Sequence, residues 1–111
     1  MNLRVDKIED TLIIKLIGEL DHHSADEVRI KIDDKIERDN IKKVIMDFSK
    51  VTFMDSSGIG VVVGRFKKVS SQGGRLCIAG LREGVYKVFE LSGLFKIINC
   101  YKDVEEALKN I

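Results

Sequence analysis

The chain lacks several features that mark other classes of protein. It has no proline, and only two of its 111 residues, Cys77 and Cys100, are cysteines. A secreted domain held together by disulfides would contain more cysteine, so both thiols are expected to be reduced. No proline- or serine-rich linker divides the chain. A single domain over residues 1–111 is therefore predicted.

Long hydrophobic runs and an excess of one charge are also missing. No stretch approaches the roughly 20 consecutive apolar residues that a membrane span needs, and the start at Met1-Asn2-Leu3 has no apolar leader. The 19 basic and 18 acidic residues leave a net charge of +1, which does not favour general binding to nucleic acid or anionic lipid. We therefore expect a cytoplasmic protein with a specific protein or small-ligand partner.

The apolar residues alternate between strand-like and helix-like patterns. Strands are predicted at residues 3–6, 12–17, 44–48, 76–79 and 97–98, with 51–54 following a polar break after 44–48. Helices are predicted at about 24–39, 56–72, 85–92 and 104–111. This alternation predicts an α/β fold with a small mixed sheet of four to five strands and about four helices.

Two local signals indicate where the helices begin and end. Ser24-Ala25-Asp26-Glu27 has the spacing of a capping box, in which the serine oxygen accepts from an early amide and Glu27 reaches back. Gly73-Gly74 supplies the positive φ that ends the second helix.

The segment Met54-Asp55-Ser56-Ser57-Gly58 sets two hydroxyls where the second helix must begin. A helix N-terminus presents unpaired amide groups and a partial positive charge, which favour an anion such as a phosphoryl group. Serine at this place also caps helices, but one serine is enough for that. The pair therefore suggests a phosphorylation site.

Three glycines, Gly58, Gly60 and Gly64, lie in this second helix. Each costs about 1 kcal/mol relative to alanine in a helix interior. Something is therefore expected to approach the helix backbone closely. Either the helix packs tightly on its own sheet, or a partner protein or nucleotide contacts its first turn.

Motifs for catalysis and nucleotide binding fail at the same residues. A hydrolase elbow needs glycine two residues before its serine, where Met54 and Asp55 stand. The third glycine of a dinucleotide fingerprint comes one residue late, at Gly64, and no P-loop is present. We predict no catalytic residue, no cofactor and no enzyme activity.

Asp21-His22-His23 is the other polar cluster, in the loop before the first helix. Adjacent histidines in one loop are expected to diverge, and no further ligands at metal spacing accompany them. No metal site is predicted. Ordinary loop polarity and a partner contact both remain open.

With these elements in place, the chain resembles the STAS-domain anti-sigma factor antagonists over nearly its whole length. The resemblance is carried by residues 18–25 (GELDHHSA), 53–60 (FMDSSGIG) and 91–98 (LSGLFKII). The acidic-Ser-Ser-Gly segment marks the wider family. The double histidine and the Leu-Ser-Gly-Leu-Phe block favour the sporulation branch over the general-stress branch.

The resemblance implies a domain that is phosphorylated on Ser56 by an anti-sigma factor, itself an ATP-dependent serine kinase. The unphosphorylated form binds that anti-sigma factor and releases the sigma factor, and a PP2C-type phosphatase restores it. In the family the residue at Asp21 contributes to the partner contact, here expected without a role in stability. We expect a free monomer whose contact surface comprises Asp21, His22, His23, Asp55, Ser56, Ser57, Gly58 and Gly60.

One alternative is an antagonist in the general-stress sigma pathway. Another is a STAS module that senses a small ligand or nucleotide. That module would have a defined pocket beside Gly58 and Gly60.

Overall fold

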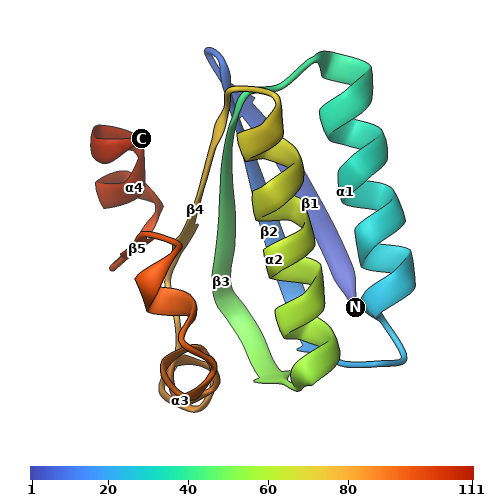
Figure 1. The fold of residues 1–111 in the computed structure, drawn as a ribbon, viewed down its shortest axis with the longest axis vertical. Helices are drawn as coiled ribbons and strands as arrows, with labels where there is room; N and C mark the ends of the chain where they lie inside the picture. The colour runs from blue at the N-terminus through green and yellow to red at the C-terminus, as the bar shows by residue number, and fades with distance from the viewer.

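A mixed five-stranded sheet forms the centre of the computed structural model, which describes residues 1–111 (Figure 1). The strands, in the spatial order β1-β2-β3-β4-β5, are β1 (Asn2–Ile8), β2 (Thr11–Leu20), β3 (Lys43–Met54), β4 (Arg75–Ala79) and β5 (Cys100–Tyr101). β1 runs antiparallel to β2, and all other neighbours are parallel. The predicted α/β fold is confirmed.

Four helices surround the sheet. They are α1 (Ala25–Asp39), α2 (Ser56–Ser71), α3 (Glu83–Ser92) and α4 (Val104–Asn110), with a short 3-10 turn, η1 (Leu94–Lys96), after α3. α1 and α2 lie side by side in front of the sheet, and α3 lies at the end where β3 meets α2 (Figure 1). None of these helices is both long and apolar enough to cross a bilayer.

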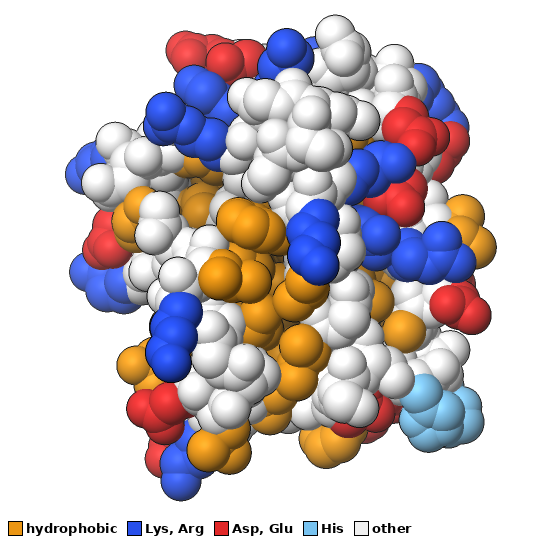
Figure 2. Space-filling model, viewed as in Figure 1, with side chains coloured by type: hydrophobic (Ala, Val, Ile, Leu, Met, Phe, Trp, Pro, Cys, Tyr) orange, Lys and Arg blue, Asp and Glu red, His pale blue; other side chains and the backbone are white.

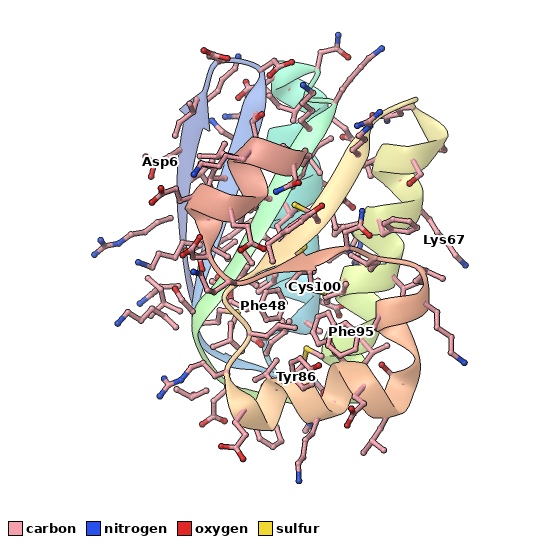
Figure 3. The ribbon with its side chains drawn as sticks, turned by 90° about the vertical axis from the view of Figure 1, so that its left-hand side faces the viewer. Asp6, Phe48, Lys67, Tyr86, Phe95 and Cys100 are labelled. Atoms are coloured by element: carbon pink, nitrogen blue, oxygen red, sulfur yellow. The ribbon has the colours of Figure 1, made fainter.

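The two faces of the sheet build two cores. Leu12, Ile14 and Leu16 of β2 enter the larger core beneath α1 and α2. Ile13 points the other way, into a small core with Ala107 of α4. This division follows from the period of two along a strand. Phe48 of β3 is labelled in Figure 3. Its ring packs edge-on against that of Phe89 of α3, with centroids 5.6 Å apart.

Two strand predictions differ from the structure. Ile97-Ile98 is not a strand, because the amides of both residues donate to Leu94 O in the turn that follows η1. The last strand begins at Cys100, which pairs with Ile78. The predicted polar break in β3 is also absent. Instead β3 bulges between Asp47 and Lys50, opposite Lys15 and Ile17 of β2, and continues to Met54.

A buried ion pair fixes α1 against α2. Asp33 Oδ1 of α1 lies 2.8 Å from Arg65 Nε of α2, and Arg65 is only 7% exposed. Burial lowers the pKa of the Arg65 guanidinium, and the nearby Asp33 carboxylate opposes that shift. Since arginine stays charged in proteins, its buried charge depends on Asp33 for compensation.

Replacing Asp33 by Asn tests this dependence. Asp33→Asn leaves a buried guanidinium without a countercharge and is expected to lower the free energy of unfolding by about 3 kcal/mol. Asp34→Asn removes an exposed carboxylate that pairs with Arg38 within α1. This variant should change the free energy of unfolding by less than about 0.5 kcal/mol. Urea denaturation of both variants measures the difference. Equal losses would contradict the special role of Asp33.

Candidate functional site

The ends of β2 and β3 bring the two predicted site segments together. These strands are parallel, and their last residues, Leu20 and Met54, are paired. The chain therefore leaves both strands at the same end of the sheet, the lower end in Figure 1. There Asp55 N donates to Leu20 O at 3.4 Å. Residues 21–24 and the first turn of α2 are neighbours as a result.

Asp55, and neither serine, caps α2. Its backbone is extended, and its Oδ1 accepts hydrogen bonds from Ser57 N at 2.9 Å and from Gly58 N at 3.4 Å. Ser56 is the first residue of the helix. Serine capping, which the sequence left open, is therefore wrong, because the aspartate one residue earlier already fills that role.

The second oxygen of the same carboxylate reaches the other loop. Asp55 Oδ2 accepts from His22 N at 3.3 Å and lies 3.8 Å from His22 Nδ1. The Asp55 side chain is 31% exposed, so solvent screens this contact only in part. One carboxylate thus ties the N-terminus of α2 to the loop before α1.

Asp21 organises that loop in a similar way. Its Oδ1 accepts from His23 N at 2.9 Å and from Ser24 N at 3.1 Å, while its carbonyl oxygen accepts from Ala25 N. Desolvation of the carboxyl acts to raise its pKa, but the hydrogen bonds from Ser24 and His23 outweigh this, and the pKa lies below its ordinary value. Asp21 therefore stabilises the loop, which differs from the expectation that it has no role in stability, and its contact with a partner stays a prediction.

The predicted capping box before α1 does not form. Ser24 has helical backbone angles and makes no cap hydrogen bond to α1. Its Oγ donates to Glu19 O at 2.9 Å, and Glu27 pairs with Lys31 at 2.7 Å. The Ser24 hydroxyl is engaged by the loop instead, because it donates to Glu19 O and accepts from Asp21 N at 3.1 Å.

The Ser56 side chain is available from outside the domain. Ser56 is exposed, whereas Ser57 is half-buried, and neither hydroxyl takes part in a hydrogen bond within the chain. The amides of Ser57 and Gly58 are already bonded to Asp55. An anion on Ser56 would therefore meet the helix dipole but would compete with a carboxylate for these amides.

Of the three glycines in α2, only Gly58 is closely approached. A Cβ at Gly58 would lie 2.8 Å from Leu20 O and 3.0 Å from Leu20 Cγ, so the helix packs tightly on β2 at this point. A Cβ at Gly60 or Gly64 would meet nothing within 4 Å. The expected close approach is correct for the first glycine, and no part of the chain explains the other two.

The two histidines face each other. Their ring centroids are 3.9 Å apart, with an interplanar angle of 39°, so the predicted divergence is wrong. The amides of the two residues are bonded to Asp55 and Asp21 respectively, which fixes the turn between them. No hydrogen bond joins either ring to Ser56 or Ser57. Figure 2 shows the pair as one exposed patch at the lower right.

No cavity lies beside Gly58 or Gly60, where the small-ligand alternative predicted one. A cavity of about 260 Å³ lies along the second half of α2 instead, where Phe66 and Ser70 face Arg75, Ile97 and Tyr101. None of the cavities in the structure is lined by either glycine. The pocket expected for a small-ligand module is therefore not found beside these glycines.

The fold and the site define a small α/β domain whose candidate site is an exposed surface at the start of a helix. The model of the STAS domain family matches residues 2–107. The chain is 36% identical over 113 residues to the anti-sigma F factor antagonist of Paenibacillus polymyxa, covering 100% of this chain and 97% of that protein. It is 36% identical over 101 residues to the anti-sigma-B factor antagonist of Bacillus subtilis, covering 89% and 91%.

Solved structures agree with these relatives. The unphosphorylated anti-sigma factor antagonist SpoIIAA superposes with a TM-score of 0.83 at 34% identity, covering 96% of this chain and 93% of that one. The phosphorylated SpoIIAA of Bacillus superposes with a TM-score of 0.75 at 33% identity and 97% coverage of both. The chain belongs to the STAS-domain family of anti-sigma factor antagonists.

Alanine at the three glycines of α2 tests the packing of the site. Gly58→Ala forces a methyl group against Leu20 and is expected to lower the free energy of unfolding by about 1–3 kcal/mol. Gly60→Ala and Gly64→Ala add helix propensity without a clash and should raise it by up to about 1 kcal/mol each. Thermal or urea denaturation distinguishes the two signs. A stabilised Gly58→Ala variant would show that α2 does not pack on β2 as described.

The link between the two loops is tested at Asp55. Asp55→Ala removes a helix cap, at a cost of about 1 kcal/mol, and should also speed hydrogen exchange of the His22 amide. Asp103 caps α4 through Glu106 N at 2.9 Å, so Asp103→Ala is a matched control with a similar stability loss. That control should leave the amides of residues 21–24 unchanged in NMR spectra. A His22 amide equally protected in both variants would rule out the link.

Proposed function

We propose that the chain is an anti-anti-sigma factor whose binding to an anti-sigma factor ends when Ser56 is phosphorylated. The observation that carries the proposal is the exposed Ser56 hydroxyl, free of internal hydrogen bonds, at the edge shared with the loop of Asp21, His22 and His23. A modifying enzyme can reach this oxygen without unfolding the domain. A protein that docks on the same edge must cover it.

Within the domain, phosphorylation should change little. The phosphoryl group brings about −1.5 to −2 charges. The dipole of α2 favours it by roughly 0.3–1 kcal/mol, and the neighbouring Asp55 carboxylate opposes it by a similar amount. These effects nearly cancel, so the fold is expected to stay intact.

At an interface the balance is different. A dianion pressed against a surface shaped for a hydroxyl must lose its water, and an unpaired buried charge costs roughly 2–5 kcal/mol. At 1.4 kcal/mol for each factor of ten, that weakens the affinity by about 30-fold to several thousandfold. Local electrostatics can therefore operate the switch without refolding.

The enzymes of the cycle belong to the partners. The anti-sigma factor acts as an ATP-dependent serine kinase on Ser56, and a PP2C-type phosphatase removes the phosphate, both in the cytoplasm. This chain supplies the acceptor hydroxyl and needs neither a catalytic residue nor a cofactor. The relatives named as anti-sigma factor antagonists, and the two forms in which SpoIIAA has been solved, support this assignment.

We further propose that the regulated factor is the sporulation sigma factor, sigma F. Overall identity does not decide this, because the sigma F and sigma-B antagonists are both 36% identical to the chain. The double histidine and residues 91–98 support the sporulation branch.

The contact surface comprises Asp21, His22, His23, Asp55, Ser56 and Ser57, with Gly60 exposed beside them. Gly58 is buried and packs on β2, so we assign it to positioning rather than to contact.

Variants at Ser56 test the proposal by calorimetric titration with the anti-sigma factor of the same organism. Ser56→Ala should bind without responding to ATP. Ser56→Asp should bind at least about tenfold more weakly, since it places a charge at the interface. Ser70→Asp adds the same charge at the exposed far end of α2 and should bind normally. Equal affinities of the two aspartate variants would refute the role of Ser56.

Phosphate transfer provides a separate check. After incubation with the anti-sigma factor and ATP, mass spectrometry should find one phosphate, on Ser56. Ser57→Ala should still be modified, and Ser56→Ala should not. Phosphate on Ser57 instead would move the switch to the half-buried hydroxyl and contradict the assignment.

A further inference from the structure

The outer edge of β1 has no partner in the domain. β1 is the first strand of the sheet and pairs only with β2. Six of its seven residues are exposed, including Val5 at 39% and Ile8 at 47%. Such an edge presents a row of backbone amide and carbonyl groups that can pair with another strand.

The charges on this strand are uncompensated within the chain. Arg4 lies directly opposite Lys15 of β2, and like charges in that position are unfavourable. Asp6 lies opposite Ile13, and no ion pair in the structure includes Arg4 or Asp6. Leu3 packs against the larger core, on the face of the sheet that α1 and α2 cover. Successive residues of a strand point to opposite faces, so Arg4 and Asp6 lie on the other face.

We propose that β1 binds β1 of a second copy of this chain, antiparallel and in one register, centred on Val5. In that register Arg4 of each copy lies opposite Asp6 of the other. Two cross-strand ion pairs form around a two-fold axis, and each arginine gains a carboxylate to offset Lys15. Val5 meets Val5, which covers an exposed apolar side chain.

The charges select this register against its neighbours. Sliding the strands by two residues in one direction places Arg4 opposite Arg4, and in the other direction it places Asp6 opposite Asp6. A slip of one residue sets side chains of opposite faces against each other. Only the register centred on Val5 therefore has opposite charges facing each other.

The two-fold axis leaves the site at Ser56 free. The paired β1 strands run in opposite directions, so the ends of β2 and β3 that carry the site point away from each other in the two copies. The inference therefore does not depend on the proposed function, and each copy keeps its own docking surface.

The contact is small, and the dimer must be weak. Seven residues of edge strand bury less than the 1,200–2,000 Å² or so of stable interfaces, so self-association is expected only at about 0.1–1 mM protein. Charged residues also guard many sheet edges against pairing. If the charges of β1 serve only to prevent edge pairing, the chain remains a monomer at all concentrations, as expected from its sequence.

Exchanging the charges of Arg4 and Asp6 in the proposed β1–β1 contact tests the proposal. Sedimentation velocity and NMR diffusion, from about 0.02 to 1 mM protein, should show a monomer–dimer equilibrium with shift changes confined to β1 amides. Arg4→Asp and Asp6→Arg should each weaken it about tenfold or more, because like charges then face each other. An equimolar mixture of the two variants restores both pairs and should form a heterodimer. The double variant R4D/D6R should self-associate like the unaltered chain.

Lys102→Asp makes the same change of charge at an exposed position outside β1 and should leave the association unchanged. Because Arg4 and Asp6 are exposed, all variants are expected to fold. Thermal melting curves of each variant check this. A monomer at every concentration overturns the proposal. So does association that neither single variant weakens, or a mixture that stays monomeric.

Discussion

The geometry of the site depends on one carboxylate, that of Asp55. Its Oδ1 satisfies two amides at the start of α2, and its Oδ2 accepts from the His22 amide in the loop before α1. Two segments 33 positions apart in the chain thereby become one surface. The parallel pairing of β2 with β3 makes this possible, because both strands end at Leu20 and Met54 at the same edge of the sheet.

This arrangement suits a switch that acts by charge alone. The helix end at Ser56 is already neutralised by Asp55, and α2 is held by close packing at Gly58 and by the buried pair of Asp33 and Arg65. We therefore expect a phosphoryl group on Ser56 to leave the position of α2 unchanged. Its effect should fall on whatever protein covers the exposed hydroxyl, where the group loses its water.

The candidate site and the free edge of β1 lie on different parts of the sheet. The ends of the parallel strands β2 and β3 carry the candidate site, whereas the free edge of β1 runs along the side of the sheet and presents its own pattern of charge. The larger core lies beneath α1 and α2. α4 covers the opposite face and closes the small second core.

Local sequence determined the order of the elements, the α/β class and the placement of an exposed serine at a helix start, because alternation and helical spacing record which side of each segment is buried. Only the tertiary structure decided that Asp55 rather than a serine caps α2, that Asp21 replaces the capping box at Ser24, and that Gly60 and Gly64 stay open. It also moved the last strand from Ile97 to Cys100, since two apolar residues carry no periodicity. Asp55 and Asp21 bond amides only two or three residues away, but the point at which each helix begins depends on where the paired strands β2 and β3 end. Those strands lie far apart along the chain, so the local pattern alone did not choose among adjacent polar residues.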